Sequence, residues 1–213
     1  MAVITISRQA GSRGARIARG LAKELGWEFA DKSTINRVIR QYGLVRLNEF
    51  YDELPTLGDL FSDNAALTIE MMNETIAAIA ARGNVVILGR GAFAVLKDVA
   101  DVLNVFVEAP LEARVARIAK RDDTDLETAE ERVKADDKLR RRFTRRYYNA
   151  NWANPENYDL VVNTGEITDD QAIEQILAAL HGLPARAEGS ASEALAVHPV
   201  LAQTIDEVMG GKA

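Results

Sequence analysis

The sequence contains no cysteine, only two histidines and no apolar run long enough to cross a membrane. The missing cysteine excludes disulfides, thiolate zinc sites and a cysteine nucleophile, and it suits a reducing compartment, so we expect a cytoplasmic location. With two histidines, a metal site built from several imidazoles is not expected. The first residues lack a basic stretch followed by a long apolar one, so we expect neither a secretory signal peptide nor a membrane partner.

Positive charge is also scarce overall, because 32 acidic residues outnumber 26 lysines and arginines and give a formal net charge of −6. This balance argues against non-specific binding to nucleic acid, although it permits a local basic site. The 213 residues, 47% of them hydrophobic, suit one soluble domain with its own core, with or without an insertion. We assign this domain to residues 1–184. Residues 185–213 form a tail rich in Ala, Gly, Ser and Glu that can pack on the domain or extend from it.

Short apolar segments alternate along the chain with stretches of helical periodicity. Strands are expected at Val3–Ser7, Trp27–Ala30, Val85–Leu88, Val102–Glu108 and Tyr158–Val162. Helices are expected at Ala15–Leu25, Leu111–Arg121, Leu126–Tyr148, Asp169–Leu180 and about Pro199–Met209, and within residues 33–83, where no strand is expected. Strands that are apolar on both faces and separated by helices are typical of an α/β fold with a mainly parallel sheet, here of about five strands. The pattern leaves the strand order open.

The turn after the first predicted strand is the first candidate for chemistry. Gly11 and Gly14 allow the backbone to approach an anion, Ser12 can donate a hydrogen bond, and the next helix directs its positive end to the same place. The phosphate-loop pattern G-x-x-x-x-G-K-[ST] is incomplete, because the turn has no lysine and no Ser or Thr follows Gly14. Phosphate binding and an ordinary strand-to-helix turn therefore both remain open. Three arginines add positive charge here: Arg8, Arg13 and Arg16.

A second candidate is the tripeptide Gly89-Arg90-Gly91, which directly follows the predicted strand Val85–Leu88. Ligands of open α/β sheets lie beyond the carboxyl ends of the strands. An arginine at that place can bind phosphate or carboxylate through two parallel hydrogen bonds. The alternative is an ordinary turn with a solvated arginine.

The third candidate is segment 114–146, which holds nine arginines and three lysines among many acidic residues. A charged helical face is usually only solvated, but Arg140–Arg146 is denser in charge than solvation requires, and Tyr147, Tyr148 and Trp152 follow it. Arginines with aromatic neighbours can bind nucleic acid, or they can form a mobile lid that closes over a polyphosphate. The acidic total charge and the phosphate-type turn favour the lid, so we expect no nucleic-acid partner.

Taken together, these segments resemble the cytidylate kinase-like family, a branch of the nucleoside monophosphate kinases. The resemblance covers about residues 1–182. It rests on SRQAGSRGARIARGLAKELG at 7–26, FADKSTI at 29–35, VVILGRGA at 85–92, VFVEAPLEARVARIAKR at 105–121 and DKLRRRFTRRYYNANWANPENYDLVVNTG at 137–165. The resemblance implies a P-loop kinase-like parallel sheet flanked by helices. It further implies a helical monophosphate-binding insertion at 33–83 and an arginine-rich helical lid at 122–150.

The resemblance also implies roles for single residues. Arg90 would bind the acceptor phosphate, and Asp31 lies where the acceptor site begins. Asp137 precedes Arg140 in D-x-x-R spacing and would orient it. The donor phosphates would bind at Gly11, Ser12, Arg13, Gly14, Ala15 and Arg16, with Arg8 beside them and Asn163 and Thr164 near the donor base. The arginines of the lid or of the transfer step would be Arg121, Arg140 and Arg146.

The implied activity is ATP-dependent phosphoryl transfer to a nucleoside monophosphate, with CMP or dCMP first. Nucleotides are the partners, and Mg²⁺ is held by substrate phosphates without a dedicated protein site. In cytidylate kinases the turn carries a lysine and a threonine at the positions of Gly14 and Arg16, and the branch usually reads G-S-G-G where this chain has Arg13. Arg13 either substitutes for the lysine, which the uncompensated donor charge favours, or turns to an acidic side chain. Two alternatives stay open: a nucleotide-binding or regulatory protein with impaired catalysis, and a small-molecule kinase with another acceptor.

Overall fold

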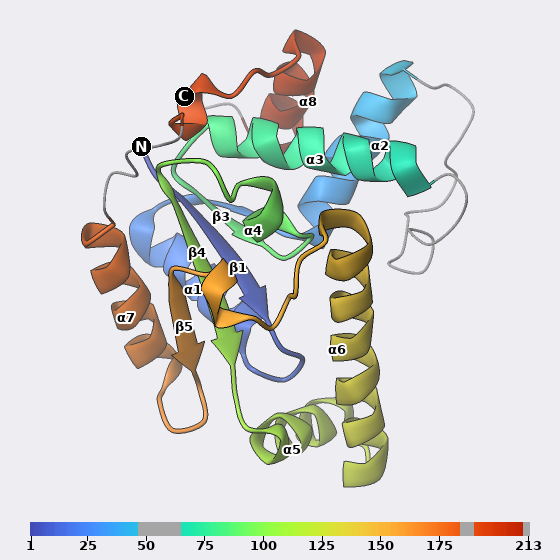
Figure 1. The fold of residues 1–213 in the computed structure, drawn as a ribbon, viewed down its shortest axis with the longest axis vertical. Helices are drawn as coiled ribbons and strands as arrows, with labels where there is room; N and C mark the ends of the chain where they lie inside the picture. Colours follow the sequence, from blue (N-terminus) through green and yellow to red (C-terminus); the bar gives the residue numbers. More distant parts are fainter. Residues whose placement is uncertain (47–64, 184–189, 211–213) are drawn as a thin grey trace.

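The computed structural model describes residues 1–46, 65–183 and 190–210 (Figure 1). Its strands are β1 (Val3–Arg8), β2 (Glu28–Ala30), β3 (Val85–Leu88), β4 (Val102–Glu108) and β5 (Leu160–Asn163). They form one five-stranded sheet in the order β2-β3-β1-β4-β5, and every neighbouring pair is parallel. The expected α/β fold with a parallel sheet is therefore confirmed.

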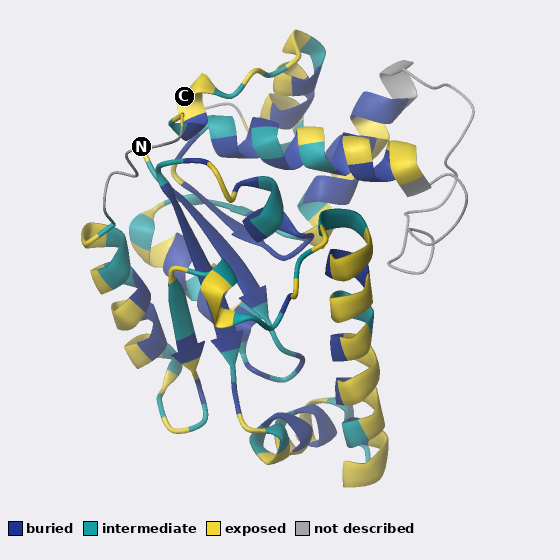
Figure 2. Cartoon of the chain, in the orientation of Figure 1, coloured by how far each residue is buried: buried dark blue, intermediate teal, exposed yellow. Residues whose placement is uncertain are grey.

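The central strands are buried because helices cover both faces of the sheet, as Figure 2 shows. Their apolar runs VITIS, VVIL and VLNVFV fit this position, since a strand covered on both sides needs no polar face. One polar pair inside the sheet is satisfied, because Thr5 Oγ1 donates to Asn104 Oδ1 at 2.6 Å. Two outer strands begin later than predicted, β2 at Glu28 and β5 at Leu160.

Two helices, α1 (Gly14–Leu25) and α7 (Asp169–His181), cover one face of the sheet. Ile17 and Leu21 of α1 and Ile176 of α7 are completely buried in that layer. The other face is covered by α2 (Lys32–Arg46), α3 (Ala65–Ala81), the single turn α4 (Ala92–Val95) and α8 (Pro199–Met209). Two short 3₁₀ helices, Pro155–Asn157 and Ser192–Ala194, lie in connections.

The predicted helical insertion at 33–83 appears as α2 and α3, while residues 47–64 between them lie outside the described residues. The described part of the tail packs on this layer, because Leu201 and Ile205 of α8 are buried against it. Arg82 strengthens the contact, since its guanidinium contacts both Glu28 and Asp206. None of the helices that the structure describes is both long and apolar enough to cross a membrane.

The remaining helices, α5 (Leu111–Asp122) and α6 (Leu126–Tyr148), form a pair beyond the carboxyl ends of β1 and β4 (Figure 1). They pack on each other and on the turn after β1 through a small cluster that includes Ala10, Ile118 and Val133. The carboxyl end of α6 reaches the helical layer that contains α3, where Tyr148 Oη donates to Asn73 Oδ1 at 2.8 Å. The segment 114–146 is therefore divided between two helices, and its arginine cluster Arg140–Arg146 lies on α6, which runs from the turn after β1 to the helical insertion.

Candidate functional site

The turn between β1 and α1 is fixed by a buried carboxylate on α6. Asp137 Oδ1 accepts hydrogen bonds from the N–H of Ala10 at 2.9 Å and from Arg140 Nη1 at 2.9 Å. Its Oδ2 lies 2.7 Å from Arg114 Nη1 of α5. Arg114 is also buried, and it donates to the carbonyls of Ala109 and Ala10 at 2.9 and 3.2 Å. Asp137 therefore contacts Arg140 as predicted, and it also ties the turn to both helices.

The amino end of α1 is open to a ligand. The N–H groups of Gly11, Arg13, Gly14 and Ala15 donate to no acceptor among the described residues. Gly11 and Arg13 both have left-handed backbone conformations, with φ of 77° and 66°. A helix end carries about half a positive charge. Free N–H groups at that end are therefore suited to phosphate oxygens.

Two hydroxyl groups of the predicted donor site are structural rather than exposed. Ser12 Oγ donates to the carbonyl of Gln9 at 2.9 Å, and Thr164 Oγ1 donates to the carbonyl of Ser12 at 2.9 Å. Both residues are completely buried. Asn163 is exposed, and its Oδ1 accepts from the N–H of Gly165 at 2.9 Å. Ser12 and Thr164 thus join the turn after β1 to the end of β5.

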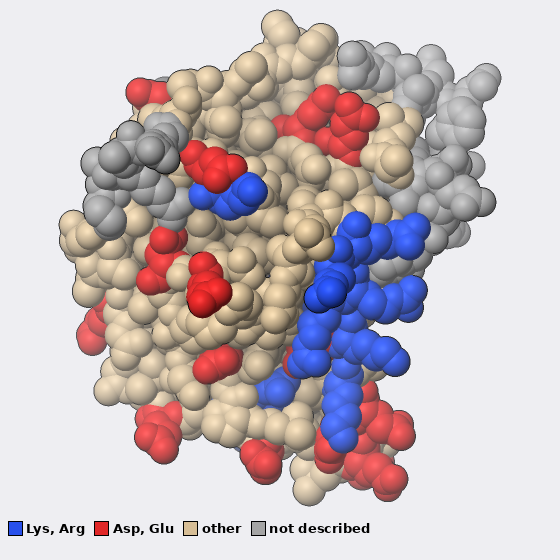
Figure 3. Space-filling view, viewed as in Figure 1, with Lys and Arg blue, Asp and Glu red and all other residues tan. Residues whose placement is uncertain are grey.

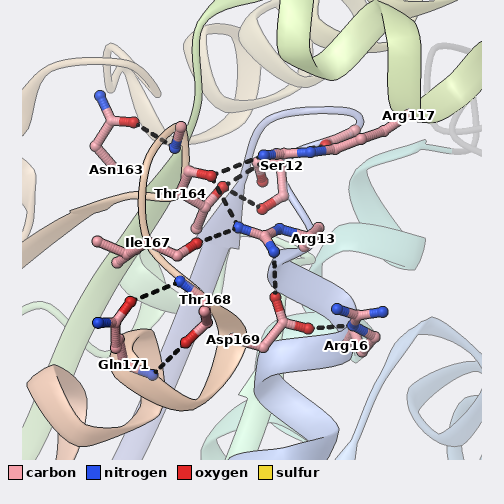
Figure 4. Close-up of polar contacts among 12 residues, drawn as sticks. Ser12, Arg13, Arg16, Arg117, Asn163, Thr164, Ile167, Thr168, Asp169 and Gln171 are labelled. Atoms are coloured by element: carbon pink, nitrogen blue, oxygen red, sulfur yellow. Dashed lines mark hydrogen bonds and ion pairs between the residues drawn. The ribbon is translucent and has the colours of Figure 1, made fainter.

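Arg13 takes the second of its two expected arrangements and turns away from the open helix end (Figure 4). Its Nη2 donates to the carbonyls of Thr164 and Ile167 at 2.8 and 2.5 Å, and its Nη1 lies 3.0 Å from Asp169 Oδ1. Arg16 Nε contacts the other oxygen of the same carboxylate. The guanidinium of Arg13 is thus paired with Asp169 and two backbone carbonyls, and these contacts connect α1 to the amino end of α7.

A cavity of about 740 Å³ lies at the open end of α1. Its basic side chains far outnumber its single acidic one, Asp136, so its charge suits an anion with several phosphates. The basic residues that line it are Arg8, Arg13, Arg16, Arg19, Arg117, Lys120, Arg121 and Arg140. Gly11 and Ala15 of the predicted donor site line the same cavity.

A second cavity, of about 200 Å³, lies at the carboxyl end of β3, and the predicted acceptor arginine is among the residues that line it. Arg90 is only 9% exposed and has a left-handed backbone, with φ of 56° between two glycines. Its Nη2 donates to Asn36 Oδ1 of α2 at 2.8 Å, while its Nε has no partner among the described residues. Burial lowers the pKa of Arg90 to about 10. A buried cation with an unused donor is suited to a small anion.

The two cavities share two cations, Arg8 and Arg140. Burial, followed by repulsion from Arg140 and Arg90, lowers the pKa of Arg8 to about 10. Three arginines therefore converge at the junction. Figure 3 shows further lysines and arginines gathered along α6 beside it, with acidic residues at the amino end of that helix.

Asp31, which was predicted to lie at the start of the acceptor site, has protein partners that account for both of its carboxylate oxygens. Asp31 Oδ1 accepts from the N–H groups of Ser33 and Thr34 at 2.8 and 3.3 Å, so it caps the start of α2. Its Oδ2 lies 3.2 Å from Arg19 Nη2. The contacts of Asp31 are therefore a helix cap on α2 and an ion pair with Arg19, which lines the larger cavity.

The remaining two lid arginines differ in position. Arg121 lines the larger cavity, although its guanidinium is held by Asp122 through contacts of 2.7 and 2.9 Å. Arg146 is exposed near the end of α6, with its guanidinium 5.7 Å from the ring centroid of Tyr147. It lines neither the larger nor the smaller cavity. The structure thus brings Arg121 and Arg140 to the site and leaves Arg146 outside it.

Residues 3–166 match the cytidylate kinase-like family. The chain belongs to that family. A cytidylate kinase of Ignicoccus hospitalis is 34% identical over 179 residues, which is 83% of this chain and 97% of the relative. A cytidylate kinase of Natronomonas pharaonis is 30% identical over 171 residues, which is 79% of this chain and 83% of the relative.

Solved structures share the fold of this member of the cytidylate kinase-like family. An uncharacterized protein from Eubacterium ventriosum superimposes with a TM-score of 0.69 at 21% identity, covering 85% of this chain and 99% of the other. A gluconokinase from Sinorhizobium meliloti gives a TM-score of 0.53 at 13% identity, covering 85% and 93%. The five-stranded parallel sheet flanked by helices is therefore a P-loop kinase fold.

Several residues around the site of this family member were not singled out from the sequence. Arg114 and Arg117 both contact the first turn, the latter through a hydrogen bond from Nη1 to the carbonyl of Gly11 at 3.3 Å. Their spacing with Arg121, at i, i+3 and i+7, places all three on one face of α5 and was the available signal. Asp169 and Asn36 gave no such signal, because their arginine partners are far away in sequence.

Proposed function

We propose that the protein is an ATP-dependent nucleoside monophosphate kinase, with CMP or dCMP as the acceptor. The observation that carries the proposal is the pair of cation-lined cavities that meet at Arg8 and Arg140. The larger cavity, at the open end of α1, suits a polyphosphate donor, and the smaller one, around Arg90, suits a single phosphate. The cytidylate kinases among the relatives support the choice of acceptor.

In the proposed reaction an oxygen of the acceptor phosphate forms a bond to the γ-phosphorus of ATP. The bond between that phosphorus and the β–γ bridging oxygen breaks, and ADP leaves with the electron pair. With a dianionic monophosphate, charge is conserved without transfer of a proton, so no side chain acts as nucleophile or base. Positioning and neutralisation of charge carry such a transfer. The N–H groups at the start of α1 and the arginines of both cavities are the protein groups placed to do this.

Among the described residues, no three His, Asp or Glu side chains lie together as a metal site. Mg²⁺ prefers phosphate oxygens and water, with one or two carboxylates, so it fits here as a companion of the nucleotide. Asp136 lines the larger cavity, and it would be the carboxylate there that could contact the ion or its water. When bound, the ion would supply further neutralisation of the donor phosphates.

The proposal also assigns roles to the helical insertion at 33–83 and to residues 122–150. The helices within 33–83 would form the acceptor side, where Arg90 and Asn36 already touch. Residues 122–150 would form the lid, with Arg121 and Arg140 facing the donor. Arg16 is 73% exposed at the mouth of the larger cavity, and only its Nε is held by Asp169, so its terminal nitrogens can meet the nucleotide.

A coupled assay that detects ADP tests the proposal, with CMP, dCMP, UMP and AMP as acceptors. We expect the highest kcat/KM with CMP or dCMP and a strong dependence on Mg²⁺. Tight nucleotide binding without ADP formation would favour the alternative of a nucleotide-binding or regulatory protein with impaired catalysis. The absence of a lysine at position 14 is the observation that supports this alternative. ADP formation with a sugar or another small alcohol, and with none of the four nucleotides, would favour a small-molecule kinase.

A further inference from the structure

Gly14 occupies the loop position where the phosphate-binding pattern has its lysine, and the side chain of Arg8 fills the space beside it. A Cβ atom built on Gly14 would lie 2.5 Å from Cβ and 3.0 Å from Cγ of Arg8. Two carbon atoms attract only at about 3.5–4 Å, so this approach is repulsive. Residue 14 can therefore carry a side chain only if residue 8 carries none, because the nearest clash is with the Cβ of Arg8, an atom that every residue except glycine has.

The guanidinium of Arg8 lies where the two cavities meet. Arg8 ends β1, the central strand of the sheet, and lines both cavities. Its Nη1 lies against Gly89, where a side chain would overlap with it. Among the described residues, its side chain has no hydrogen bond or ion pair, although burial and neighbouring cations lower its pKa. Asp31 and Asp136 attract this cation without pairing with it, so a bound phosphoryl group would supply the direct counter-ion that the described residues do not.

The neighbouring cations are less available for this role. Arg13 is answered by Asp169 and two carbonyls. Arg140 is anchored by Asp137 at 2.9 Å and lies 3.7 Å from Asp136. Arg90 keeps an unused Nε but donates to Asn36, so among the described residues Arg8 is the junction arginine that has no hydrogen bond to protein at all.

We propose that Arg8 is a catalytic residue that replaces the loop lysine, supplying from the end of β1 a positive charge that contacts the γ-phosphoryl group of ATP before and during transfer. This inference rests on the proposed function. The transferred group spreads its negative charge over its three outer oxygens. A planar guanidinium can donate to two of them at once, so it can serve where a lysine would donate from a single point.

The first test compares Arg8→Met, Arg8→Lys and the double variant Arg8→Gly/Gly14→Lys with the wild type, and the double variant with Arg8→Gly. Arg8→Met should lower kcat about 100-fold, as loss of one transition-state donor does. The double variant should recover at least about tenfold over Arg8→Gly, because removal of the Cβ of residue 8 makes room for the lysine, which restores the charge. The control is Lys23→Met, which removes an exposed cation near the end of α1 that lines neither cavity, and it should keep wild-type kcat.

Arg8→Lys and Arg8→Met retain a long side chain and differ in charge, so they decide the question even where the double variant does not fold. At equal melting temperature, Arg8→Lys should exceed Arg8→Met in kcat by about tenfold or more. Equal rates for the two variants, or a kcat of Arg8→Met within about threefold of the wild type, would overturn the inference.

A binding experiment separates this inference from the proposed function. By calorimetry the wild type should bind ATP more tightly than ADP, and Arg8→Met should weaken ATP binding about tenfold while leaving ADP binding unchanged. This result needs no acceptor, so it holds even if no nucleoside monophosphate is phosphorylated. An unchanged preference for ATP in Arg8→Met would overturn the role of Arg8, whereas absence of turnover alone would overturn only the proposed activity.

Discussion

Replacing Arg8 by methionine should stabilise the unliganded protein even as it removes transfer activity. Burial, with repulsion from Arg140 and Arg90, lowers the pKa of Arg8 well below its ordinary value, to about 10. At about 1.4 kcal/mol for each tenfold change in proton affinity, the charged side chain costs the folded state about 3 kcal/mol at neutral pH. Methionine keeps an unbranched apolar stem and lacks the charge, so we expect the free energy of unfolding to rise by about 2–3 kcal/mol.

The sign of the pH dependence follows from the direction of the pKa shift. The folded pKa of Arg8 lies below the unfolded one, so folding is penalised wherever Arg8 is charged in both states. The penalty is complete below about pH 10 and disappears as the pH rises toward the higher pKa of the unfolded state. The stability difference between the methionine variant and the wild type should therefore be constant around neutral pH.

Urea denaturation at neutral pH, with and without pyrophosphate, measures the effect. Pyrophosphate should stabilise the wild type more than the variant, because it supplies the counter-ion that Arg8 lacks. Arg141→Met is the control, since its exposed charge carries no such penalty and its unfolding free energy should stay within about 0.5 kcal/mol of the wild type. If Arg8→Met is less stable than the wild type without anions, the reasoning from buried charge is wrong.

Three further substitutions have expected outcomes. Arg90→Ala should weaken acceptor binding by about 1.5–3 kcal/mol in a CMP titration without unfolding the protein, and unchanged affinity would contradict the role of that arginine. Arg13→Gly should lower the free energy of unfolding by about 1–2 kcal/mol, since lost contacts to Asp169 and two carbonyls outweigh relief of the left-handed backbone. The Arg13→Gly variant should bind ATP as tightly as the wild type in a calorimetric titration. A clear loss of ATP affinity would show that Arg13, and not Arg8, substitutes for the loop lysine. Asp137→Ala leaves buried Arg114 without its carboxylate and should cost about 3–5 kcal/mol in chemical denaturation, so a loss below about 1 kcal/mol would refute that assignment.

Local sequence patterns were sufficient to place most elements. Parallel strands covered on both faces need uninterrupted apolar runs, so Val85–Leu88 and Val102–Glu108 were predicted to the residue. The start of β5 was missed by two residues, because Tyr158 is of a type that favours strands, whereas the ladder with β4 begins only at Leu160. The single turn α4 was missed, since four residues carry no helical periodicity.

The site was harder to predict because its contacts join distant parts of the chain. Two glycines and several arginines in sequence indicated a phosphate site, but the partner that decides the orientation of Arg13 is Asp169, 156 residues further on. Strand order is likewise set by contacts between distant segments and leaves no local mark. The Gly14 position was visible from the sequence, whereas the use of its space by Arg8 depends on the course of the backbone.

Helix α6 links the two halves of the site mechanically. Midway along it, Asp137 and Arg140 hold the first turn and border the donor cavity. Near its end, Tyr148 bonds to Asn73 of α3 and lies so close to Gly91 that no side chain would fit there. If α6 moves as one body when the donor binds, it also moves Tyr148, which lies against Gly91 at the smaller cavity on the acceptor side. Binding of the two substrates would then be cooperative, and thermodynamic reciprocity requires each to change the affinity for the other by the same factor.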